Sequence, residues 1–184
     1  MNSDLITLTA RQFLERWKLL AHYEPLPAGV EIEYSTGLDL DTLLMMQADA
    51  WYASRFTEAP REILPVSEIA PSLTPVRLPD GAARIALPDG IIDLVSVMVD
   101  GWYHPASIIR DPDSAVARAQ CNPFCRAGSH HPVALYSRSG RSLTLFTPPP
   151  GNISLTSVRA ILRPEKGVYL FTPELLATIP SLTP

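Results

Sequence analysis

The sequence predicts an α+β protein: N-terminal helices packed with a mostly antiparallel β-sheet or sandwich, followed by a short C-terminal helix. Three observations predict this class. Residues 1–62 hold two segments with the apolar spacing of amphipathic helices. From residue 63 onward, Pro and Gly recur, and the apolar runs become short and β-branched, as in strands. We therefore expect an N-terminal helical region over 1–62 and a β-rich region with a short final helix over 63–184, joined in one compact structural unit.

The first predicted helix begins after Thr9. Gln12, three residues further on, completes a capping box, in which each side chain satisfies a backbone N–H of the other residue. The apolar residues that follow have the spacing of one helical face: Phe13, Leu14, Trp17, Leu20 and Ala21. We expect this helix to end near His22.

The second predicted helix is the stronger one. Asp39 is its expected N-cap, and residues 40–56 contain no Gly or Pro and many good helix formers. Its wide apolar stripe consists of Leu40, Leu43, Leu44, Ala48, Trp51, Tyr52 and Phe56. The helix should stop before Pro60, and we expect its stripe to cover one face of the sheet.

Five apolar runs in the second half predict strands. They span 83–88, 91–109, 132–140, 141–148 and 153–164. Ser139–Gly140 indicates a hairpin between the third and fourth runs, and Glu165–Gly167 indicates another hairpin after the fifth.

Turns and a final helix complete the predicted elements. The two LPDG motifs, at 78–81 and 87–90, favour turns with a positive φ at Gly. Thr172 and Pro173 predict the cap and first position of a last helix over 172–179.

The composition limits the function classes. The chain is 46% hydrophobic, enough for a core, and its net charge of −4 offers no overall electrostatic footprint for nucleic acid. Residues 1–92 carry a net charge of −6 and residues 93–184 a net charge of +2. Such a chain can stack head-to-tail on copies of itself, although chance variation of a solvated surface explains the same split.

The first 20 residues lack a basic segment followed by an apolar run, and no apolar run is long enough to cross a bilayer. We therefore expect a protein of the cytoplasm, or one assembled there, with no membrane partner. In that reducing compartment the two cysteines are expected to be free thiols.

The stretch CNPFCRAGSHH holds ligand types that suit zinc: Cys121, Cys125, His130 and His131. The spacing does not suit a zinc site, because structural sites pair cysteines more closely and adjacent histidines in extended chain point to opposite sides. Pro123 also removes a backbone donor that such turns use. We interpret the stretch as a surface loop and predict no metal.

No other pattern predicts catalysis. Ser129, His130 and an aspartate at 111 or 113 offer the residue types of a triad, but no G-x-S-x-G elbow accompanies them. Neither a G-x-G-x-x-G nor a Walker pattern is present. We therefore predict no catalytic residues, no cofactor and no enzymatic activity. Trp102 and Tyr103 have the chemistry to stack on a sugar or base, or to pack against a partner.

Two stretches resemble a known family. RIALPDGIIDLVSVMVDGWYHPASII (84–109) and NPFCRAGSHHPVALY (122–136) resemble segments of virion proteins at the head–tail junction of short-tailed bacteriophages. The family is the tail tubular protein A or gatekeeper type, with the related ring and adaptor proteins of crAss-like phages. Gly90 departs from its pattern, since a second acidic residue is common there, and the cysteines and paired histidines are not typical of it.

The resemblance implies a fold of helices plus a β-sandwich, and a homo-oligomeric ring that contacts the portal protein, its neighbours and the tail. It implies a structural role in the virion, after assembly in the host cytoplasm, without sequence-specific nucleic-acid binding. The interface candidates are Trp51, Tyr52, Trp102, Tyr103, Pro123 and Phe124.

Two alternatives remain open from the residues. One is a β-sandwich module that binds a carbohydrate or another ligand through Trp102 and Tyr103. The other is a small metalloprotein that uses Cys121, Cys125 and His130.

Overall fold

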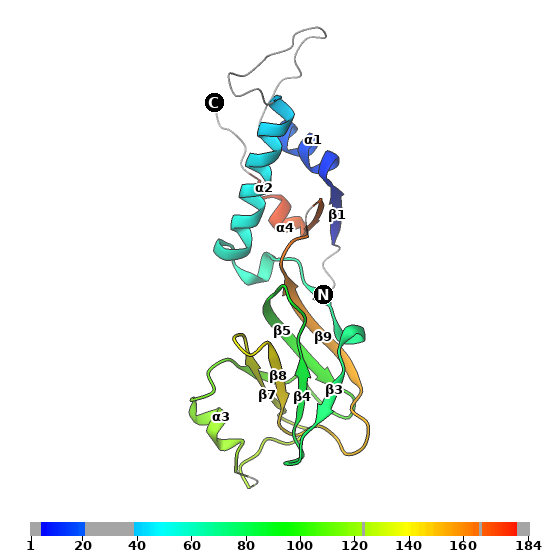
Figure 1. The fold of residues 1–184 in the computed structure, drawn as a ribbon, viewed down its shortest axis with the longest axis vertical. Coiled ribbons are helices and arrows are strands. Elements are labelled where there is room, and N and C mark those ends of the chain that lie inside the picture. Colours follow the sequence, from blue (N-terminus) through cyan, green and yellow to red (C-terminus); the bar gives the residue numbers. More distant parts are fainter. Residues whose placement is uncertain (1–4, 21–38, 123, 166, 180–184) are drawn as a thin grey trace. The chain divides into compact units, whose positions relative to one another are not determined.

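The computed structural model describes residues 5–20, 39–122, 124–165 and 167–179 and has the predicted α+β class (Figure 1). It divides into two compact units: unit 1 comprises residues 1–65 and 163–184, and unit 2 comprises residues 66–162. The predicted β-rich region, 63–184, included residues 163–184, whereas in the structure these residues belong to unit 1. The physical reason is a long-range strand pairing within unit 1.

In its described residues, unit 1 combines three α-helices and one 3-10 helix with a two-stranded antiparallel sheet. Its strands are β1 (Ile6–Thr9) and β10 (Val168–Phe171), which pair from Ile6 with Phe171 to Thr9 with Val168. Its helices are α1 (Ala10–Leu20), α2 (Leu40–Glu58), α4 (Pro173–Leu176) and the 3-10 helix η1 (Arg61–Ile63). The four residues of β1 were not predicted as a strand.

Aromatic rings fill the core of unit 1. The ring of Phe13 lies 4.6 Å from that of Tyr169 and 5.3 Å from that of Phe171, between ring centroids. The Tyr52 hydroxyl donates to the carbonyl of Leu170 (2.7 Å) and accepts from the Leu170 N–H (2.9 Å). The apolar stripe of α2 therefore packs on α1 and on β10, so it covers the two-stranded sheet of unit 1, to which the predicted β-rich region contributes β10.

Local capping signals are confirmed at both long helices. The Thr9 N–H donates to Gln12 Oε1 (2.9 Å), and the Gln12 N–H donates back to Thr9 Oγ1 (3.3 Å). At α2, the Thr42 N–H donates to Asp39 Oδ1 (2.6 Å). The predicted end of the first helix at residues 21–22 lies outside the described residues.

The short α4 is also capped as predicted. Thr172 Oγ1 accepts the N–H of Leu175 (3.1 Å), and Pro173 occupies the first helical position. The same hydroxyl donates to the carbonyl of Ile63, so one side chain starts α4 and ties it to the end of η1.

Unit 2 is a sandwich of two sheets. One has the strand order β2-β9-β5 and the other β3-β4-β8-β7-β6. All pairings are antiparallel except the one between β6 and β7. The elements are β2 (Ser67–Glu68), the 3-10 helix η2 (Ala70–Ser72), β3 (Pro75–Arg77), β4 (Ala83–Ala86), β5 (Ile91–Val99), β6 (Ser107–Ile109), α3 (Ala115–Ala119), β7 (Val133–Ser137), β8 (Ser142–Leu145) and β9 (Leu155–Leu162).

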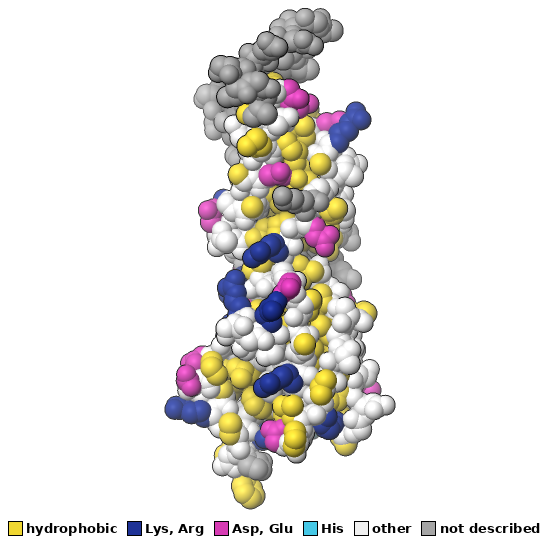
Figure 2. All heavy atoms as spheres, in the orientation of Figure 1, with side chains coloured by type: hydrophobic (Ala, Val, Ile, Leu, Met, Phe, Trp, Pro, Cys, Tyr) yellow, Lys and Arg dark blue, Asp and Glu magenta, His cyan; other side chains and the backbone are white. Residues whose placement is uncertain are grey.

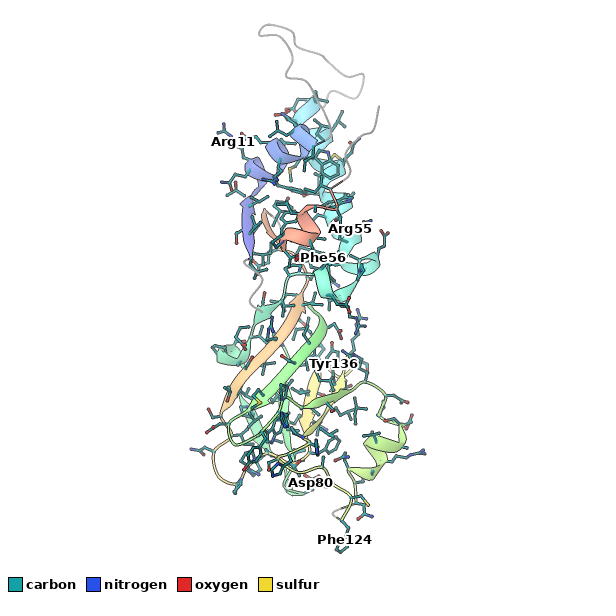
Figure 3. All side chains as sticks on the ribbon, turned by 180° about the vertical axis from the view of Figure 1, so that it is seen from behind. Arg11, Arg55, Phe56, Asp80, Phe124 and Tyr136 are labelled. Carbon is teal, nitrogen blue, oxygen red and sulfur yellow. The ribbon has the colours of Figure 1, made fainter. Side chains whose placement is uncertain are left out.

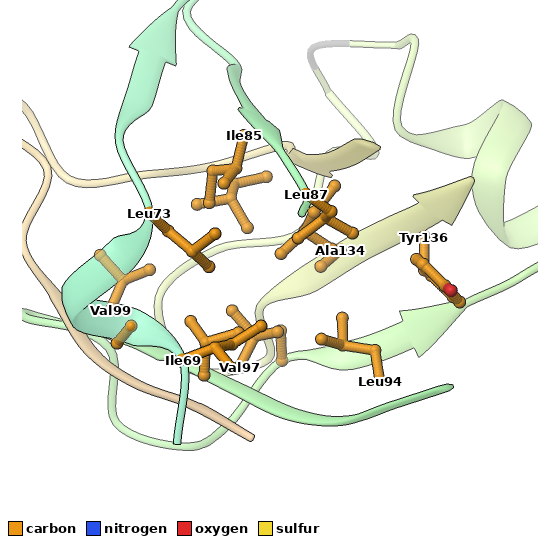
Figure 4. Packing of buried hydrophobic residues seen from close by; sticks show 14 of the residues in the cluster. Ile69, Leu73, Ile85, Leu87, Leu94, Val97, Val99, Ala134 and Tyr136 are labelled. Carbon is orange, nitrogen blue, oxygen red and sulfur yellow. The ribbon is translucent and has the colours of Figure 1, made fainter. Parts of the chain in front are cut away.

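Alternate side chains of both sheets meet in one core. Leu94 and Val97 of β5 and Ile85 of β4 are fully buried, and the register shift between Leu94 and Ser96 lets both β5 side chains, three residues apart, face the core. Figure 4 shows these side chains converging, with Ile69 and Leu73 from either side of η2 beside them. The core of unit 2 is thus built from its own residues.

The predicted strand runs are present but divide and pair differently. The run 91–109 splits into β5 and β6, because Gly101 has a φ of 86° and turns the chain. The predicted hairpin at 165–167 was wrong: β9 pairs with β2 and β5, whereas β10 leaves to pair with β1. Residue 166 itself lies outside the described residues.

The glycines of the LPDG motifs have the predicted positive φ, 84° at Gly81 and 90° at Gly90. The β7–β8 turn differs, because the left-handed residue there is Arg141 (φ 43°). Gly140 is needed for close approach, since a Cβ would lie 2.9 Å from Ser137 Oγ.

Candidate interaction surface

The structure divides the six predicted contact residues into buried and exposed ones. Tyr52 and Trp102 are 3% and 4% exposed and belong to the cores of their own units. Trp51 is half-buried, with the Arg55 guanidinium 5.7 Å from its ring centroid. Tyr103 and Phe124 are exposed, and Pro123 lies outside the described residues.

Trp102 holds the β5–β6 connection in place. Its Nε1 donates to the carbonyl of Thr147 (3.0 Å), which follows β8. The preceding Gly101 lies so close to Pro149 that a Cβ would come within 3.1 Å of that ring. The Trp side chain therefore packs inward and is not available to a partner or sugar.

Tyr103 faces outward and stacks on His130. Their ring centroids are 4.2 Å apart and the ring planes differ by 6°. The Tyr103 N–H also donates to the carbonyl of Ser129 (3.1 Å). The stack is a flat aromatic surface, held by backbone, at the β5–β6 connection.

Phe124 projects from a loop that is anchored on both sides. Gln120 is buried and its Oε1 accepts the N–H of Ala127 (2.8 Å). Arg126 donates to the carbonyls of Gln120 (2.9 Å) and Asp80 (2.9 Å). The Phe124 side chain is 97% exposed, and Figure 3 shows it at the far end of this loop. A phenyl ring in water on an anchored loop is a contact group of the kind that interfaces bury.

The zinc-type cluster does not assemble. Cys121 and Cys125 are exposed free thiols, and His130 is engaged with Tyr103. Throughout the described residues, no three His, Cys, Asp or Glu side chains lie where they could hold a metal ion.

One aspartate of the triad residue types is engaged within its own turn. The Asp111 carboxylate accepts the N–H of Asp113 (2.9 Å) within its own turn, and the side chain of Ser114 caps α3. In the described part of the chain, no helix is both long and apolar enough to span a bilayer.

The outer face of the five-stranded sheet carries an arginine groove, which we define by Arg84, Arg110, Arg138 and Arg141. It is an open depression of about 1150 Å³ whose lining contains no acidic residue. Register brings its parts together: Arg84 on β4 lies opposite Thr144 on β8, which lies opposite Leu135 on β7. Serine hydroxyls of the β7–β8 hairpin, and the apolar Val76, Pro112 and Leu135, complete the lining.

Two of the four arginines already hold carboxylates. The Arg110 guanidinium donates to both oxygens of the buried Asp93 (3.2 Å each) and to the carbonyl of Leu94 (3.1 Å). Arg141 pairs with the exposed Asp89. Arg84 and Arg138 have no ion-pair partner within the described part of the chain, so the groove has an excess of positive charge.

Tyr136 lies beneath the groove. Burial raises the pKa of its hydroxyl, the nearby Asp93 adds to the rise, and Arg138 and Arg110 oppose it. The hydroxyl is therefore neutral at physiological pH and leaves the positive charge of the groove uncompensated.

The arginine groove was not predicted from the sequence. Arg138 and Arg141 are neighbours on one hairpin, but Arg84 and Arg110 are far from them along the chain and come alongside through the register of β4, β8, β7 and β6. The available signal was weak: the second half is mildly basic, and all eight cationic residues of unit 2 are arginines.

No protein-family model matches the chain, and no curated protein is significantly similar to it.

Proposed function

We propose that this chain is a non-enzymatic structural protein of a tailed-bacteriophage virion. In this role it forms part of the head–tail connector, as a homo-oligomeric ring docked between the portal protein and the tail. The chain is assembled in the host cytoplasm and needs no cofactor for this role.

One observation carries the proposal: the two stretches that resemble connector proteins pack as a single body. β6, from the stretch 84–109, pairs in parallel with β7, from the stretch 122–136, beginning with Ser107 opposite Val133. The Tyr103–His130 stack joins the same two stretches. The stretches 84–109 and 122–136, which are separate in the sequence, are therefore neighbours in the fold. This is expected if both belong to one contact surface for a partner protein.

The order of elements supports the proposal further. Two long helices precede the sandwich and a short helix follows it, as the resemblance implies. The two units also bury separate cores, which leaves their exposed loops free to contact neighbours.

The contact chemistry lies in Tyr103 and Phe124. Exposed aromatic rings on backbone-anchored loops lose little conformational entropy on binding and bury a large area, which makes them frequent energetic centres of interfaces. The sugar-binding alternative relied on Trp102 and Tyr103 together, and the burial of Trp102 leaves it only Tyr103 as a stacking ring.

Binding to the portal protein encoded in the same genome tests the proposal. We expect the chain to co-sediment with portal rings, and the double substitution Tyr103→Ala/Phe124→Ala to weaken this binding about tenfold or more, since both anchors are removed. Val116→Ala is the matched control, because Val116 is 53% exposed on the nearby α3 but lies outside both contact groups.

Two results would contradict the proposal or its contact residues. The first is a chain that neither binds portal rings nor is found in particles that contain portal and tail. The second, equal portal binding by the double variant, would contradict the assignment of the portal contact to Tyr103 and Phe124.

A further inference from the structure

The two units of the chain differ in charge. Unit 1 carries 7 Lys+Arg and 12 Asp+Glu, a net charge of −5. Unit 2 carries 8 arginines and 7 Asp+Glu, a net charge of +1, and four of those arginines line one groove that contains no acid. Each copy of the chain thus presents an acidic body and a cationic groove.

We propose that the arginine groove of one copy binds carboxylates on unit 1 of a second copy. The inference builds on the proposed function, because it names the surfaces through which neighbouring copies of the ring meet. The contact is head-to-tail, since two different patches face each other, and repetition of such a contact yields a ring when the rotation closes.

The chemistry of the groove selects an anion. Its polar lining consists of guanidinium groups and hydroxyls, which donate hydrogen bonds, and it has no carboxylate that would repel an acid. Arg84 and Arg138 supply the charge that is not neutralised within the described chain. Arg110 shows the geometry on offer, with one guanidinium nitrogen bonded to both oxygens of Asp93.

A protein partner fits the groove better than a nucleic acid. Val76 is 61% exposed and lies in the lining with Leu135 and Pro112, and arginines among apolar side chains are typical of protein interfaces. No exposed aromatic ring lines the groove to stack on a base, as single-strand binding requires. The acidic unit 1 would also repel a phosphate backbone close to the same molecule. Figure 2 shows such mixing of basic and hydrophobic groups on the face that it draws.

A second copy supplies the required acid. Exposed carboxylates in the described part of unit 1 come from α1, α2, η1, α4 and the segments before α2 and after β9: Glu15, Asp39, Asp41, Asp49, Glu58, Glu62, Glu165 and Glu174. The groove needs only two or three of these to neutralise its excess charge.

Charge reversal in the groove tests the inference. We expect Arg84→Glu/Arg138→Glu to raise the dissociation constant for self-association about tenfold or more, because like charges would then face each other. Arg118→Glu is the control for each single groove reversal, Arg84→Glu or Arg138→Glu: it reverses one charge on α3 of unit 2, outside the groove. Sedimentation over a concentration series, at low and high salt, measures the effect.

The absence of lysine in unit 2 allows a direct test of the partner surface. Both lysines of the chain, Lys18 and Lys166, fall in unit 1, so Arg138→Lys creates one amine in unit 2 while keeping the charge. After a zero-length carbodiimide cross-link of mixed ¹⁵N-labelled and unlabelled protein, we expect position 138 to be linked to carboxylates of 1–65 or 163–184. The linked peptides should pair heavy with light chains.

The outcomes separate this inference from the proposed function. Links from position 138 only within one copy, or self-association that the double reversal leaves unchanged, would overturn the inference while portal binding stands. A wild type that stays monomeric at every concentration and gives no mixed links would do the same. A groove-dependent retention of duplex DNA, lost in Arg84→Glu/Arg138→Glu but kept in Arg118→Glu, would assign the groove to phosphates instead.

Discussion

Two neighbouring residues, Trp102 and Tyr103, have opposite roles. Trp102 is buried in the sandwich and donates a hydrogen bond to the carbonyl of Thr147, whereas Tyr103 is 64% exposed and stacks on His130. From the sequence they form one aromatic pair. Both residues follow the end of β5, in the β5–β6 connection, where the hydrogen bond to Thr147 holds the Trp102 ring inward and the Tyr103 ring stacks on His130 at the surface.

Substitution of Trp102 should therefore lower the stability of unit 2 much more than substitution of Tyr103. We expect Trp102→Ala to lower the free energy of unfolding by about 3–5 kcal/mol, because it removes a large buried ring and leaves a cavity. Urea unfolding of unit 2, followed by circular dichroism, measures this change.

Two further variants serve as controls. Trp102→Phe keeps a ring but leaves the carbonyl of Thr147 without its donor, so we expect a smaller loss, about 1–3 kcal/mol. Tyr103→Ala should change stability by less than about 1 kcal/mol, as expected for an exposed side chain. Equal losses for Trp102→Ala and Tyr103→Ala would contradict the assigned burial.

At the scale of elements, one carboxylate joins two strands of a sheet. β2 has only two residues, and Glu68 compensates for its shortness. Oε1 of Glu68 accepts the backbone N–H groups of Ala70 (3.0 Å) and Val158 (2.6 Å), and Oε2 accepts the hydroxyl of Ser157 (2.6 Å). Burial alone would raise the pKa of Glu68, but these hydrogen bonds and the nearby Arg159 outweigh it and lower the pKa below its ordinary value of 4.5.

This clamp predicts a pH-dependent stability. Because the folded-state pKa of Glu68 is lowered, its stabilisation is complete above the unfolded-state value and is lost as the pH falls through the folded-state value. We expect the stability difference between wild type and Glu68→Gln to be largest above about pH 5 and to shrink towards lower pH. Chemical unfolding at a series of pH values measures it.

Ser157→Ala is a graded control for the clamp. It removes the donor to Oε2 of Glu68 and should therefore raise the pKa of Glu68 part of the way back to its ordinary value. The pH range over which the stabilisation by Glu68 is lost then becomes narrower. A stability difference for Glu68→Gln that stays constant from pH 7 to low pH would show that the clamp does not act through charge.

Elements whose signals are local could be predicted from the sequence. The caps at Asp39 and Thr172, and the positive φ of Gly81 and Gly90, depend on contacts within a few residues, which the sequence displays directly. β1 could not be predicted, because four alternating residues form a strand only when a partner such as β10 is present.

The candidate interaction surfaces depend on contacts between distant residues, as β1 does, and could not be predicted for the same reason. Exposure of Tyr103 and burial of Trp102 depend on which loop lies over the β5–β6 connection, and composition does not contain that information. The arginine groove requires the register of three strands, and a shift of one residue would move Arg84 to the other face of the sheet.

At the scale of the whole molecule, unit 2 is an insertion in unit 1. The chain leaves unit 1 at residue 65, forms the sandwich, and returns at residue 163 to supply β10 and α4. Unit 1 is incomplete without that return, because Tyr169 and Phe171 fill its aromatic core.

Removal of the residues after Leu162 should affect the two units differently. We expect a chain that ends at Leu162 to keep the sandwich folded but to lose the tertiary structure of unit 1. A fragment of 66–162 alone should fold, because its core contains none of the residues of unit 1. Amide ¹H–¹⁵N spectra of the full chain and both shortened forms measure this. Loss of dispersed signals from the 66–162 fragment would show that the sandwich depends on unit 1.

The pairing of β1 with β10 also sets an order of events on the ribosome. Residues 6–9 are synthesised early but have no strand to pair with until residues 168–171 leave the exit tunnel. The sandwich can fold in the meantime, since its chain is continuous and is made before β10. The aromatic face of α2 therefore remains exposed to solvent until β10 has been synthesised. We expect nascent unit 1 to be the part of this protein that most needs a chaperone.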